Sequence, residues 1–493
     1  MVVSVLSPKH KFVNNKSPYK RVIMILADGA RPDVLAEEMQ KGNLPHLSRH
    51  FAEEGTNATM ITSFPSTTGP AYLPYLTGCF PGTCNVPGIR WFDKVHYSQK
   101  GWGFKSFRSY VGLESFLFNR DINPNVKMAW EIFSKPRNIL NIITKGLPNK
   151  FDLTHYSRVW QFYYGHVTDK WDYLDNIASR HLSAIIKEKE FDFVFLVFPS
   201  VDEFSHRSSP FSPRVRQAYA EIDTLVGKIF KELEDAGLAD ETLITIHSDH
   251  GLSETREHFD IGPWLESEKK LKTFYYTNIF KFNFDAVSMV SGNGMVNLYF
   301  KGEKGWGYRK SFEEISHDSI LLDELRFRDE VDIVSAQGLD GAVHILTKKG
   351  HGWFKLDAVS KRVLYRFDRD DPLGIFNKND PILSQGFTFD EALALTFDTH
   401  YPDVFQQLHQ VYKSPRAGDV IVTATTGYDL RKKFEHPIHQ ASHGSLCPEH
   451  MKIPLLMNHK IDSQHFRSVD VLPTVLDLLG KDIPLGMDGR SLI

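Results

Sequence analysis

The sequence has very little cysteine and no apolar run long enough to cross a membrane. Only three of its 493 residues are cysteines, Cys79, Cys84 and Cys447. Three thiols cannot all pair with one another and no C-x-x-C motif occurs, which fits a reducing compartment; a local disulfide between Cys79 and Cys84 is the alternative. No stretch reaches the ~20 apolar residues of a membrane span, and the N-terminal M-V-V-S-V-L-S-P-K-H-K lacks the features of a signal peptide. We therefore expect a cytoplasmic protein with no membrane span.

Neither sign of charge predominates, and nucleotide-binding fingerprints are missing. The chain has 58 Lys and Arg residues against 61 Asp and Glu residues, which gives a formal net charge of −3. No basic tail, acidic tail or heptad run occurs, so no nucleic-acid surface is indicated. There is no Walker-type phosphate loop, and the G-N-G and G-H-G stretches do not open a helix after a strand, as a dinucleotide site requires.

Apolar runs of strand length alternate with helical patterns through the first half of the chain. The runs at 21–27, 191–198 and 243–246 are short and rich in β-branched or aromatic residues, which is typical of buried parallel strands. Amphipathic helices are predicted at 171–188 and 214–238. We therefore predict an α/β fold with a mostly parallel central sheet and helices on both of its faces.

The pattern changes between residues 255 and 403. Strand-like runs there alternate with Gly- and Asp-bearing turns, and the stretch from K-K-G-H-G-W-F to R-V-L-Y-R-F has the pattern of a β-meander. A chain of this length also exceeds a single small core. We predict a core formed by residues 1–254 and 404–493, which resumes with a strand at 419–424, and an inserted smaller α+β unit at 255–403.

Acidic and histidine side chains follow the three predicted core strands. Asp28 follows the first strand, Asp202 and His206 follow the second, and Asp249 and His250 follow the third. The spacing of Asp202 and His206 places both on one face if that segment is helical. Because the carboxyl ends of parallel strands meet at one edge of a sheet, we expect these groups to converge there. Taken singly, each is more often a turn or loop residue.

Further histidines lie near the C-terminus. Among His436, His439 and His443, the last is followed by glycine and is our predicted ligand. The complete set then offers three carboxylates and three imidazoles. Two zinc-like ions require this many, since each takes three or four nitrogen or oxygen ligands at a metal separation of roughly 3.5–4 Å.

Hydroxyl groups are concentrated where a predicted strand at 58–62 leads into a helix, in the stretch F-P-S-T-T-G-P-A-Y. Such a cluster can place one nucleophilic oxygen at a helix N-terminus, where backbone N–H groups stabilise an anion. The alternative is that Ser66, Thr67 and Thr68 are N-cap and turn residues, which is the commoner use of such clusters.

Together and in this order, the motifs resemble the alkaline phosphatase superfamily, nearest to its type I phosphodiesterase/nucleotide pyrophosphatase branch. The resemblance rests on I-L-A-D-G-A-R at 25–31, N-L-P-H-L at 43–47, S-T-T-G-P-A-Y at 66–72 with T-G at 77–78, V-D-E-F-S-H at 201–206, S-D-H-G at 248–251, S-H-G at 442–444 and V-D-V-L-P-T-V-L-D-L-L-G with D-G-R-S-L at 469–492. It leaves residues 88–169 and the inserted unit unmatched. The ordered set is specific, whereas no single motif is.

The resemblance implies a two-metal phosphohydrolase that cleaves a phosphodiester or phosphoanhydride in a small phosphorylated substrate. Its pattern implies one metal surrounded by Asp28, Thr68, Asp249 and His250, and a second surrounded by Asp202, His206 and His443. Thr68 is then the nucleophile, deprotonated by the first metal, and passes through a covalent phospho-threonine intermediate. The second metal helps to activate water. Zinc is the expected ion, although mixed Asp and His ligands also accept manganese or iron.

One position departs from this branch, whose members carry an asparagine three residues after the nucleophile as a donor to the phosphoryl oxygen. Here that position is Ala71, and a backbone N–H group, Tyr72 or Arg31 is the expected substitute. Two alternatives therefore stand beside the diesterase: a phosphomonoesterase or phosphonate hydrolase of the same superfamily, and a metal-containing, catalytically idle binding protein. The aromatic-rich region 88–169 either lines the substrate pocket or packs under long loops.

Overall fold

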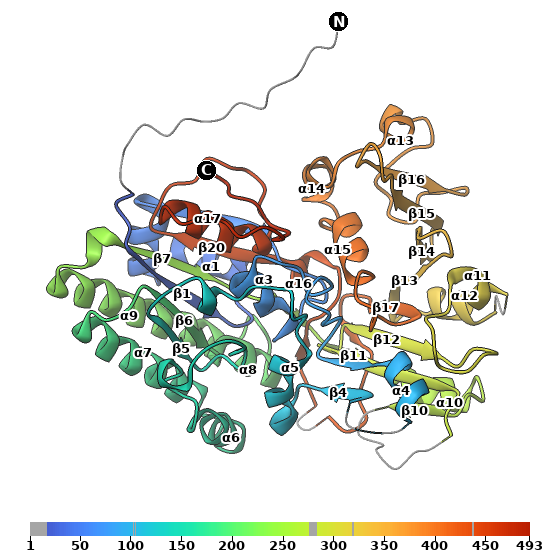
Figure 1. Cartoon of the computed structure of the whole chain (residues 1–493), viewed down its shortest axis with the longest axis horizontal. Coiled ribbons are helices and arrows are strands. Elements are labelled where there is room, and N and C mark those ends of the chain that lie inside the picture. The colour runs from blue at the N-terminus through green and yellow to red at the C-terminus, as the bar shows by residue number, and fades with distance from the viewer. Residues whose placement is uncertain (1–16, 102, 104, 276–282, 318–319, 436–437) are drawn as a thin grey trace, which may run out of the picture.

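The computed structural model describes residues 17–101, 103, 105–275, 283–317, 320–435 and 438–493, and these residues form two large sheets (Figure 1). The first sheet contains, in spatial order, β2 (Thr56–Ile61), β20 (Lys452–Met457), β7 (Thr242–His247), β1 (Arg21–Ala27), β6 (Phe193–Phe198) and β5 (Pro136–Ile139). The central strand β1 pairs in parallel with β6 and β7, and β5 pairs in parallel with β6. The strand β20 is antiparallel to both of its neighbours. The predicted mostly parallel α/β fold is confirmed.

The central strands of this sheet are buried on both sides, because helices cover both of its faces. The long helices α7 (Trp171–Glu188) and α9 (Pro213–Ala236) lie together on one side, and α3 (Leu73–Thr77) and α17 (Val471–Leu478) lie on the other (Figure 1). The helix α9 begins at the Ser212 N-cap, whose side chain accepts a hydrogen bond from the Val215 N–H, and ends at left-handed Gly237. Every residue of β6 and β7 is buried.

The second sheet has eight strands and is mainly antiparallel. Its order is β10 (Thr273–Tyr275), β11 (Ala286–Ser291), β12 (Met295–Phe300), β17 (Val420–Ala424), β13 (Val331–Gln337), β14 (Val343–Thr347), β15 (Gly350–Leu356) and β16 (Val363–Phe367). The strands β14, β15 and β16 form the predicted meander. The helices that accompany this sheet are α10 (Ile261–Ser267), α11 (Phe312–Ser316), α12 (Ile320–Arg326), α13 (Pro381–Gln385), α14 (Phe389–Thr396) and α15 (Val404–Val411).

One predicted core strand belongs to this second sheet. The stretch expected to resume the core at 419–424 forms β17, which pairs antiparallel with β12 and β13. A short, fully buried β-branched run fits the middle of either sheet, so its pattern alone does not select one. The second sheet therefore includes a strand, β17, that follows the predicted inserted unit in the chain.

The remaining helices and strands are short. They are α1 (Pro32–Gln40), α2 (Pro45–Leu47), β3 (Arg90–Phe92), α4 (Lys94–Lys100), β4 (Phe107–Ser109), α5 (Phe118–Asp121), α6 (Arg158–Thr168), α8 (Ser200–Arg207), β8 (Ser253–Glu254), β9 (Glu257–His258), β18 (Tyr428–Asp429), β19 (Ala441–Ser442) and α16 (Pro448–Met451). The three cysteines are buried and unpaired, so Cys79 and Cys84 do not form the alternative disulfide. Within the described residues, no helix combines the length and the apolar character needed to cross a bilayer.

Candidate active site

Three parallel strands deliver the predicted ligands to one edge of the first sheet. The register pairs Leu26 with His247 and Ala27 with Phe198, so β1, β6 and β7 end at the same level. Asp28 directly follows β1, while Asp249 and His250 follow β7 after one residue. A single residue, Pro199, joins β6 to the helix α8.

The first cluster consists of Asp28, Asp249 and His250, which are all buried and offer ligand atoms within 4.8 Å of one another. The His250 Nε2 atom lies 3.2 Å from Asp249 Oδ2 and 3.6 Å from Asp28 Oδ1. The Thr68 hydroxyl oxygen lies 3.1 Å from the same nitrogen. The structure thus brings the predicted nucleophile and these three predicted ligands together.

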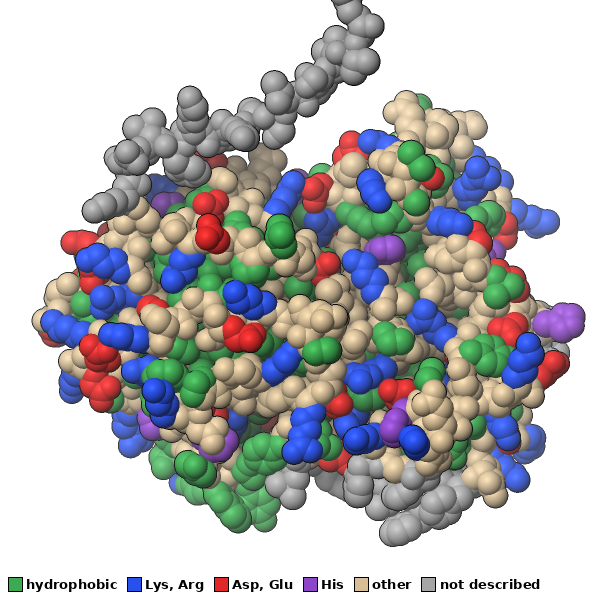
Figure 2. Space-filling model, viewed as in Figure 1, with side chains coloured by type: hydrophobic (Ala, Val, Ile, Leu, Met, Phe, Trp, Pro, Cys, Tyr) green, Lys and Arg blue, Asp and Glu red, His purple; other side chains and the backbone are tan. Residues whose placement is uncertain are grey.

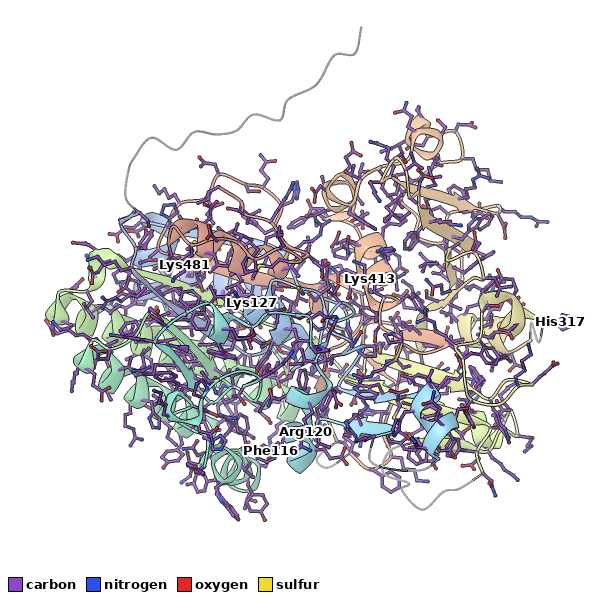
Figure 3. The ribbon with its side chains drawn as sticks, viewed as in Figure 1. Phe116, Arg120, Lys127, His317, Lys413 and Lys481 are labelled. Carbon is purple, nitrogen blue, oxygen red and sulfur yellow. The ribbon has the colours of Figure 1, made fainter. Side chains whose placement is uncertain are left out.

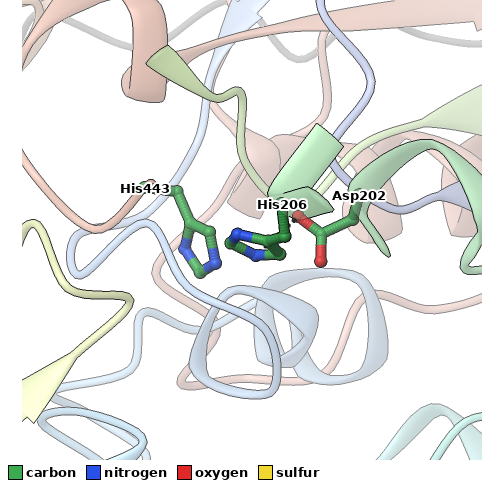
Figure 4. A group of neighbouring side chains, drawn as sticks. All are labelled: Asp202, His206 and His443. Atoms are coloured by element: carbon green, nitrogen blue, oxygen red, sulfur yellow. Dashed lines mark ion pairs between the residues drawn. The ribbon is translucent and has the colours of Figure 1, made fainter. Parts of the chain in front are cut away.

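The second cluster consists of Asp202, His206 and His443, again buried and within 4.8 Å (Figure 4). Asp202 and His206 both come from α8, one helical turn apart, and His206 Nε2 lies 3.4 Å from Asp202 Oδ1. His443 does not come from a strand of the first sheet; it follows β19, which pairs with β8.

Glycines shape the space around the second cluster. A Cβ atom on Gly292 would lie 2.6 Å from His443 Nδ1, and Gly292 has a φ of +61°, so both space and conformation require glycine. A Cβ atom on Gly29 would lie 2.8 Å from Asp202 Cα. The G-N-G stretch at 292–294, which has no role as a nucleotide fingerprint, therefore forms a wall behind His443.

The two clusters are adjacent. The rings of His250 and His443 stack with centroids 3.6 Å apart and an interplanar angle of 10°. One imidazole from each cluster thus forms the boundary between them, and Thr68 faces this boundary through His250.

The donor set fits divalent metal ions. The Nδ1 atoms of His206, His250 and His443 lie 2.7, 3.2 and 3.0 Å from the backbone carbonyls of Ala441, Gly251 and Ser66, respectively. An N–H donated to a carbonyl leaves Nε2 unprotonated and available to a metal. Among the buried carboxylate oxygens that have no hydrogen-bond partner within the described residues, three belong to the two clusters: Asp28 Oδ1, Asp202 Oδ1 and Asp249 Oδ2. Each of them faces a histidine Nε2 atom at 3.2–3.6 Å, and buried carboxylates are costly unless a cation compensates them.

The electrostatics agree with this interpretation. Burial raises the pKa of Asp28 well above its ordinary value, and the neighbouring carboxylates of Asp249 and Asp202 raise it further. Burial lowers the pKa of His206, but the Asp202 carboxylate outweighs it and raises that pKa to about 9, so a metal ion at this position would displace a proton from the ring. Burial lowers the pKa of His443 well below its ordinary value, so this ring is neutral and can act as a ligand.

A cavity of about 560 Å³ opens onto both clusters. Asp28, Thr68, Asp202, His206 and His443 line one side of it. The remaining walls come from residues of the aromatic region and from the stretch after β18: Arg90, Tyr110, Val111, Phe116, Leu140, Ile142, Arg158, Val159, Phe162, Tyr163, His166, Arg431, Phe434, Glu435 and His439. Among the described residues of the inserted unit, Gly292 and Asn293 belong to this lining.

Of the two predicted substrate contacts, Tyr72 and Arg31, the first lines the cavity and the second does not. Tyr72 lines the cavity, but its hydroxyl donates a hydrogen bond to Asp28 Oδ2. Arg31 does not line the cavity, because its guanidinium is held by Asp33 and by the carbonyl of Leu252. Ala71 is fully buried in the helical turn after Thr68.

No sequence pattern selects Glu435 or His258, and His439 is one of three histidines of which His443 is the predicted ligand. The His439 ring lies 4.1 Å from the His206 ring, and burial followed by the effect of His206 lowers its pKa to about 2. Glu435, His258 and Asp429 form a third group of close ligand atoms. Its acids are already satisfied, since both Asp429 oxygens lie 2.8 Å from His258 Nδ1 and Asn293 donates to Glu435. His436 lies outside the described residues.

The sheet topology and the two acid–imidazole clusters beside a threonine define an alkaline phosphatase-like scaffold. Two solved structures share the fold across most of the chain. Human ectonucleotide pyrophosphatase/phosphodiesterase 5 matches with a TM-score of 0.58 and 13% identity, covering 94% of this chain and 96% of that one. Phosphonoacetate hydrolase from Sinorhizobium meliloti matches with a TM-score of 0.55 and 13% identity, covering 92% and 95%.

The chain belongs to the type I phosphodiesterase / nucleotide pyrophosphatase family, whose sequence pattern it matches over residues 22–446. The family predicted from the motifs is thereby confirmed.

The match to curated relatives covers less than half of each relative's length. The human GPI ethanolamine phosphate transferase 2 catalytic subunit is 21% identical over 244 residues, which is 49% of this chain and 22% of the relative. The Debaryomyces hansenii GPI ethanolamine phosphate transferase 2 is 29% identical over 255 residues, 50% of this chain and 25% of the relative. An uncharacterised pyrophosphatase/phosphodiesterase of Schizosaccharomyces pombe is 23% identical, covering 50% and 47%. The chain thus spans a quarter or less of the first two relatives.

Proposed function

We propose that the protein is a two-metal phosphohydrolase that cleaves a phosphodiester or phosphoanhydride through a covalent intermediate on Thr68. The observation that carries this proposal is the position of the Thr68 hydroxyl, 3.1 Å from His250 and next to buried carboxylate oxygens that have no hydrogen-bond partner among the described residues. One divalent ion would be held by Asp28, Thr68, Asp249 and His250, and the other by Asp202, His206 and His443. Zinc suits this donor set best, and manganese or iron also fits it.

When bound, the two ions would lower the pKa of the Thr68 hydroxyl and offset the negative charge of the phosphoryl oxygens. The Thr68 Oγ atom attacks phosphorus, the bond from phosphorus to the leaving-group oxygen breaks, and that oxygen takes up a proton in place of the one that Thr68 has lost. Water then attacks phosphorus on the side opposite Oγ, the bond from phosphorus to Oγ breaks, and a proton from this water restores the Thr68 hydroxyl. The stacked rings of His250 and His443 fix the two ligand sets relative to Thr68 throughout these steps.

The N–H groups of Thr68 and Gly69 are suitable replacements for the missing asparagine. Neither has a hydrogen-bond acceptor within the part of the chain that the structure describes, whereas the Ala71 N–H donates to the Thr67 carbonyl at 3.0 Å. Both groups lie next to the nucleophilic oxygen in the chain. Free backbone donors at this position stabilise charge that develops on a phosphoryl oxygen.

The experiment is the turnover of bis-p-nitrophenyl phosphate by the metal-loaded protein. Thr68→Ala is expected to lower kcat by on the order of 10³-fold or more, because it removes the attacking atom. Thr59→Ala makes the same truncation on β2, outside the cavity, and should leave kcat unchanged. Acid-quenched wild-type protein should carry the phosphoryl adduct on Thr68 in a peptide mass spectrum.

The same assay separates the alternatives. Full activity of Thr68→Ala would refute the covalent mechanism, and the absence of turnover in the metal-loaded wild type would favour the idle binding protein. A p-nitrophenyl phosphate rate far above the diester rate would identify a phosphomonoesterase, and preferential phosphonate cleavage a phosphonate hydrolase.

The names of the curated relatives support a second candidate function, group transfer to an alcohol in place of water. The human and the Debaryomyces hansenii relatives described above are GPI ethanolamine phosphate transferases. A phospho-threonine intermediate serves either acceptor, because only the second attacking oxygen differs. Adding ethanolamine or glycerol to the assay tests this: a transferase forms a phosphorylated acceptor at the expense of the hydrolysis product, whereas a hydrolase does not.

A further inference from the structure

The helix α6 presents an apolar face to solvent. Tyr156, just before the helix, and Trp160, Tyr163, Tyr164 and Val167 within it are 84, 71, 63, 39 and 66% exposed, respectively. Their spacing of three or four residues places them on one side of the helix. The opposite side packs inward, with Arg158 and Gly165 buried. A surface helix ordinarily carries charged and polar residues on its outer face.

The exposed side chains form a continuous patch. Figure 2 shows a group of hydrophobic side chains at the edge of the molecule occupied by α6 in Figure 1. Phe116 is 49% exposed and Val111 53%, and Figure 3 places Phe116 next to α6. Patches of this kind on soluble proteins mark contact sites for other molecules.

The patch reaches the entrance of the catalytic cavity. Tyr163, Phe116 and Val111 are both exposed and part of the cavity lining. Leu140, Ile142, Val159 and Phe162 also line this cavity. Apolar side chains thus extend from the outer face of α6 into the cavity that holds the two clusters, and a substrate with an apolar chain would be accommodated beside them.

The stretch of chain that contains the patch has more basic than acidic residues. Residues 105–170 include ten Lys and Arg residues against five Asp and Glu residues, and two of these basic residues, Arg108 and Arg158, are buried in ion pairs with Asp121 and Asp152. Arg120 is exposed and lies near Phe116, one helical turn further along the chain (Figure 3). Basic side chains around an apolar face complement the negative surface of a membrane that contains anionic lipids.

We propose that the outer face of α6, with Phe116 and Val111, is a docking surface for a lipid bilayer, and that docking turns the cavity entrance toward the membrane. Tryptophan and tyrosine place an apolar ring in the lipid and a polar group at the headgroup level, and these are the residues found here. Delivery of a lipid-borne phosphoester to Thr68 rests on the proposed function, whereas docking itself does not.

Flotation of the full chain with lipid vesicles tests this surface. The probes are vesicles of phosphatidylcholine alone and vesicles that also contain phosphatidylserine. The variant Tyr156→Ser/Trp160→Ser/Val167→Ser changes three residues of the patch that do not line the cavity. The control, Phe327→Ser/Leu339→Ser/Val359→Ser, changes residues that are 57, 78 and 91% exposed elsewhere.

Wild type and control are expected to float with the phosphatidylserine vesicles, and the patch variant to bind at least about tenfold more weakly, because it loses buried apolar area at the membrane. Turnover of soluble bis-p-nitrophenyl phosphate should be equal in all three proteins, which also shows that the variant is folded.

Three results would overturn the proposal: wild type that floats with neither vesicle, a patch variant that floats like wild type, or light scattering that shows a wild-type dimer which the patch variant loses. The last result would assign the patch to a second copy of the chain. If vesicle binding depends on the patch but no protein turns over the diester, the proposed function fails and the docking surface stands.

Discussion

Each residue of the two clusters depends on a neighbour that holds it in place. Backbone carbonyls receive the Nδ1 side of three imidazoles, and Tyr72 donates to Asp28. Such contacts fix the ring orientation and leave Nε2 free for an ion. His450 also holds a backbone group in place, because it accepts a hydrogen bond from the loop that carries His443. The Ser445 N–H donates to His450 Nδ1 at 3.0 Å, so the proton is on Nε2, which faces Ser253 Oγ at 2.9 Å.

His450 makes the stability of the protein dependent on pH. Burial lowers the pKa of this histidine to about 3. Because the unfolded chain has a pKa of about 6.5, the contribution of His450 is complete above that pH and is lost as the pH falls toward 3. His450→Ala should lower the free energy of unfolding by about 2–3 kcal/mol at pH 8, since it leaves a buried N–H without a partner. At pH 5 the loss should be smaller by about 2 kcal/mol, because the wild-type unfolded state gains that much from protonation.

Urea unfolding of both proteins at pH 5 and pH 8 measures these differences. The same loss at both values would show that His450 is not buried in its neutral form.

At the level of elements, the helix α8 and the strand tips place the ligands, while α4 connects the aromatic region to the second sheet. The Lys94 ammonium lies 2.9 and 2.8 Å from the two Asp419 oxygens and 2.9 Å from the Phe300 carbonyl. Asp419 precedes β17 and also accepts hydrogen bonds from the Phe300 and Lys310 N–H groups. Both charged side chains are buried.

Removing one partner of this pair should be strongly destabilising. Lys94→Met leaves the Asp419 carboxylate buried without its cation, and the expected loss is about 3–5 kcal/mol in the free energy of unfolding. Lys100→Met, at the exposed end of the same helix, should change it by no more than about 0.5 kcal/mol. Denaturant unfolding compares the two, and equal effects would show that the pair does not anchor α4.

The strands of the first sheet could be predicted where a short apolar run is followed at once by polar residues. The strands β1, β6 and β7 are short apolar runs followed at once by Asp28, by P-S-V-D and by S-D-H-G, so both their burial and their polar ends are visible. The assignment of β17 failed because a buried run does not show which sheet takes it. For the aromatic region 88–169 the sequence left two interpretations open, pocket lining or packing under loops, because these residues have no regular period and their exposure depends on tertiary packing.

At the scale of the whole molecule, the clusters join segments from the start, middle and end of the chain. Asp28, Asp202 and Asp249 bring three buried carboxylates together, and burial raises the pKa of Asp28 and of Asp249. A bound ion offsets this repulsion only in the folded state, so it should stabilise the fold.

Metal removal should therefore lower the melting temperature as well as activity. Elemental analysis of the purified protein is expected to show two divalent ions per chain. Dialysis against a chelator should lower the Tm, and the corresponding free energy is about 4 kcal/mol per site at a free-ion concentration of about 1,000 times Kd. Scanning calorimetry with and without restored zinc measures it. A Tm that does not respond to the chelator would show that no ion occupies the clusters.

The antiparallel strand β20 lies between β2 and β7 and follows His443 in the chain. A product truncated before residue 443 therefore lacks one histidine of the second cluster, and it also leaves the edges of β2 and β7 open to pairing with other chains. Partial copies should be inert and prone to aggregate. Catalytic competence is thus coupled to completion of the sheet, which makes proteolytic clipping near the C-terminal segment an irreversible way to inactivate the protein.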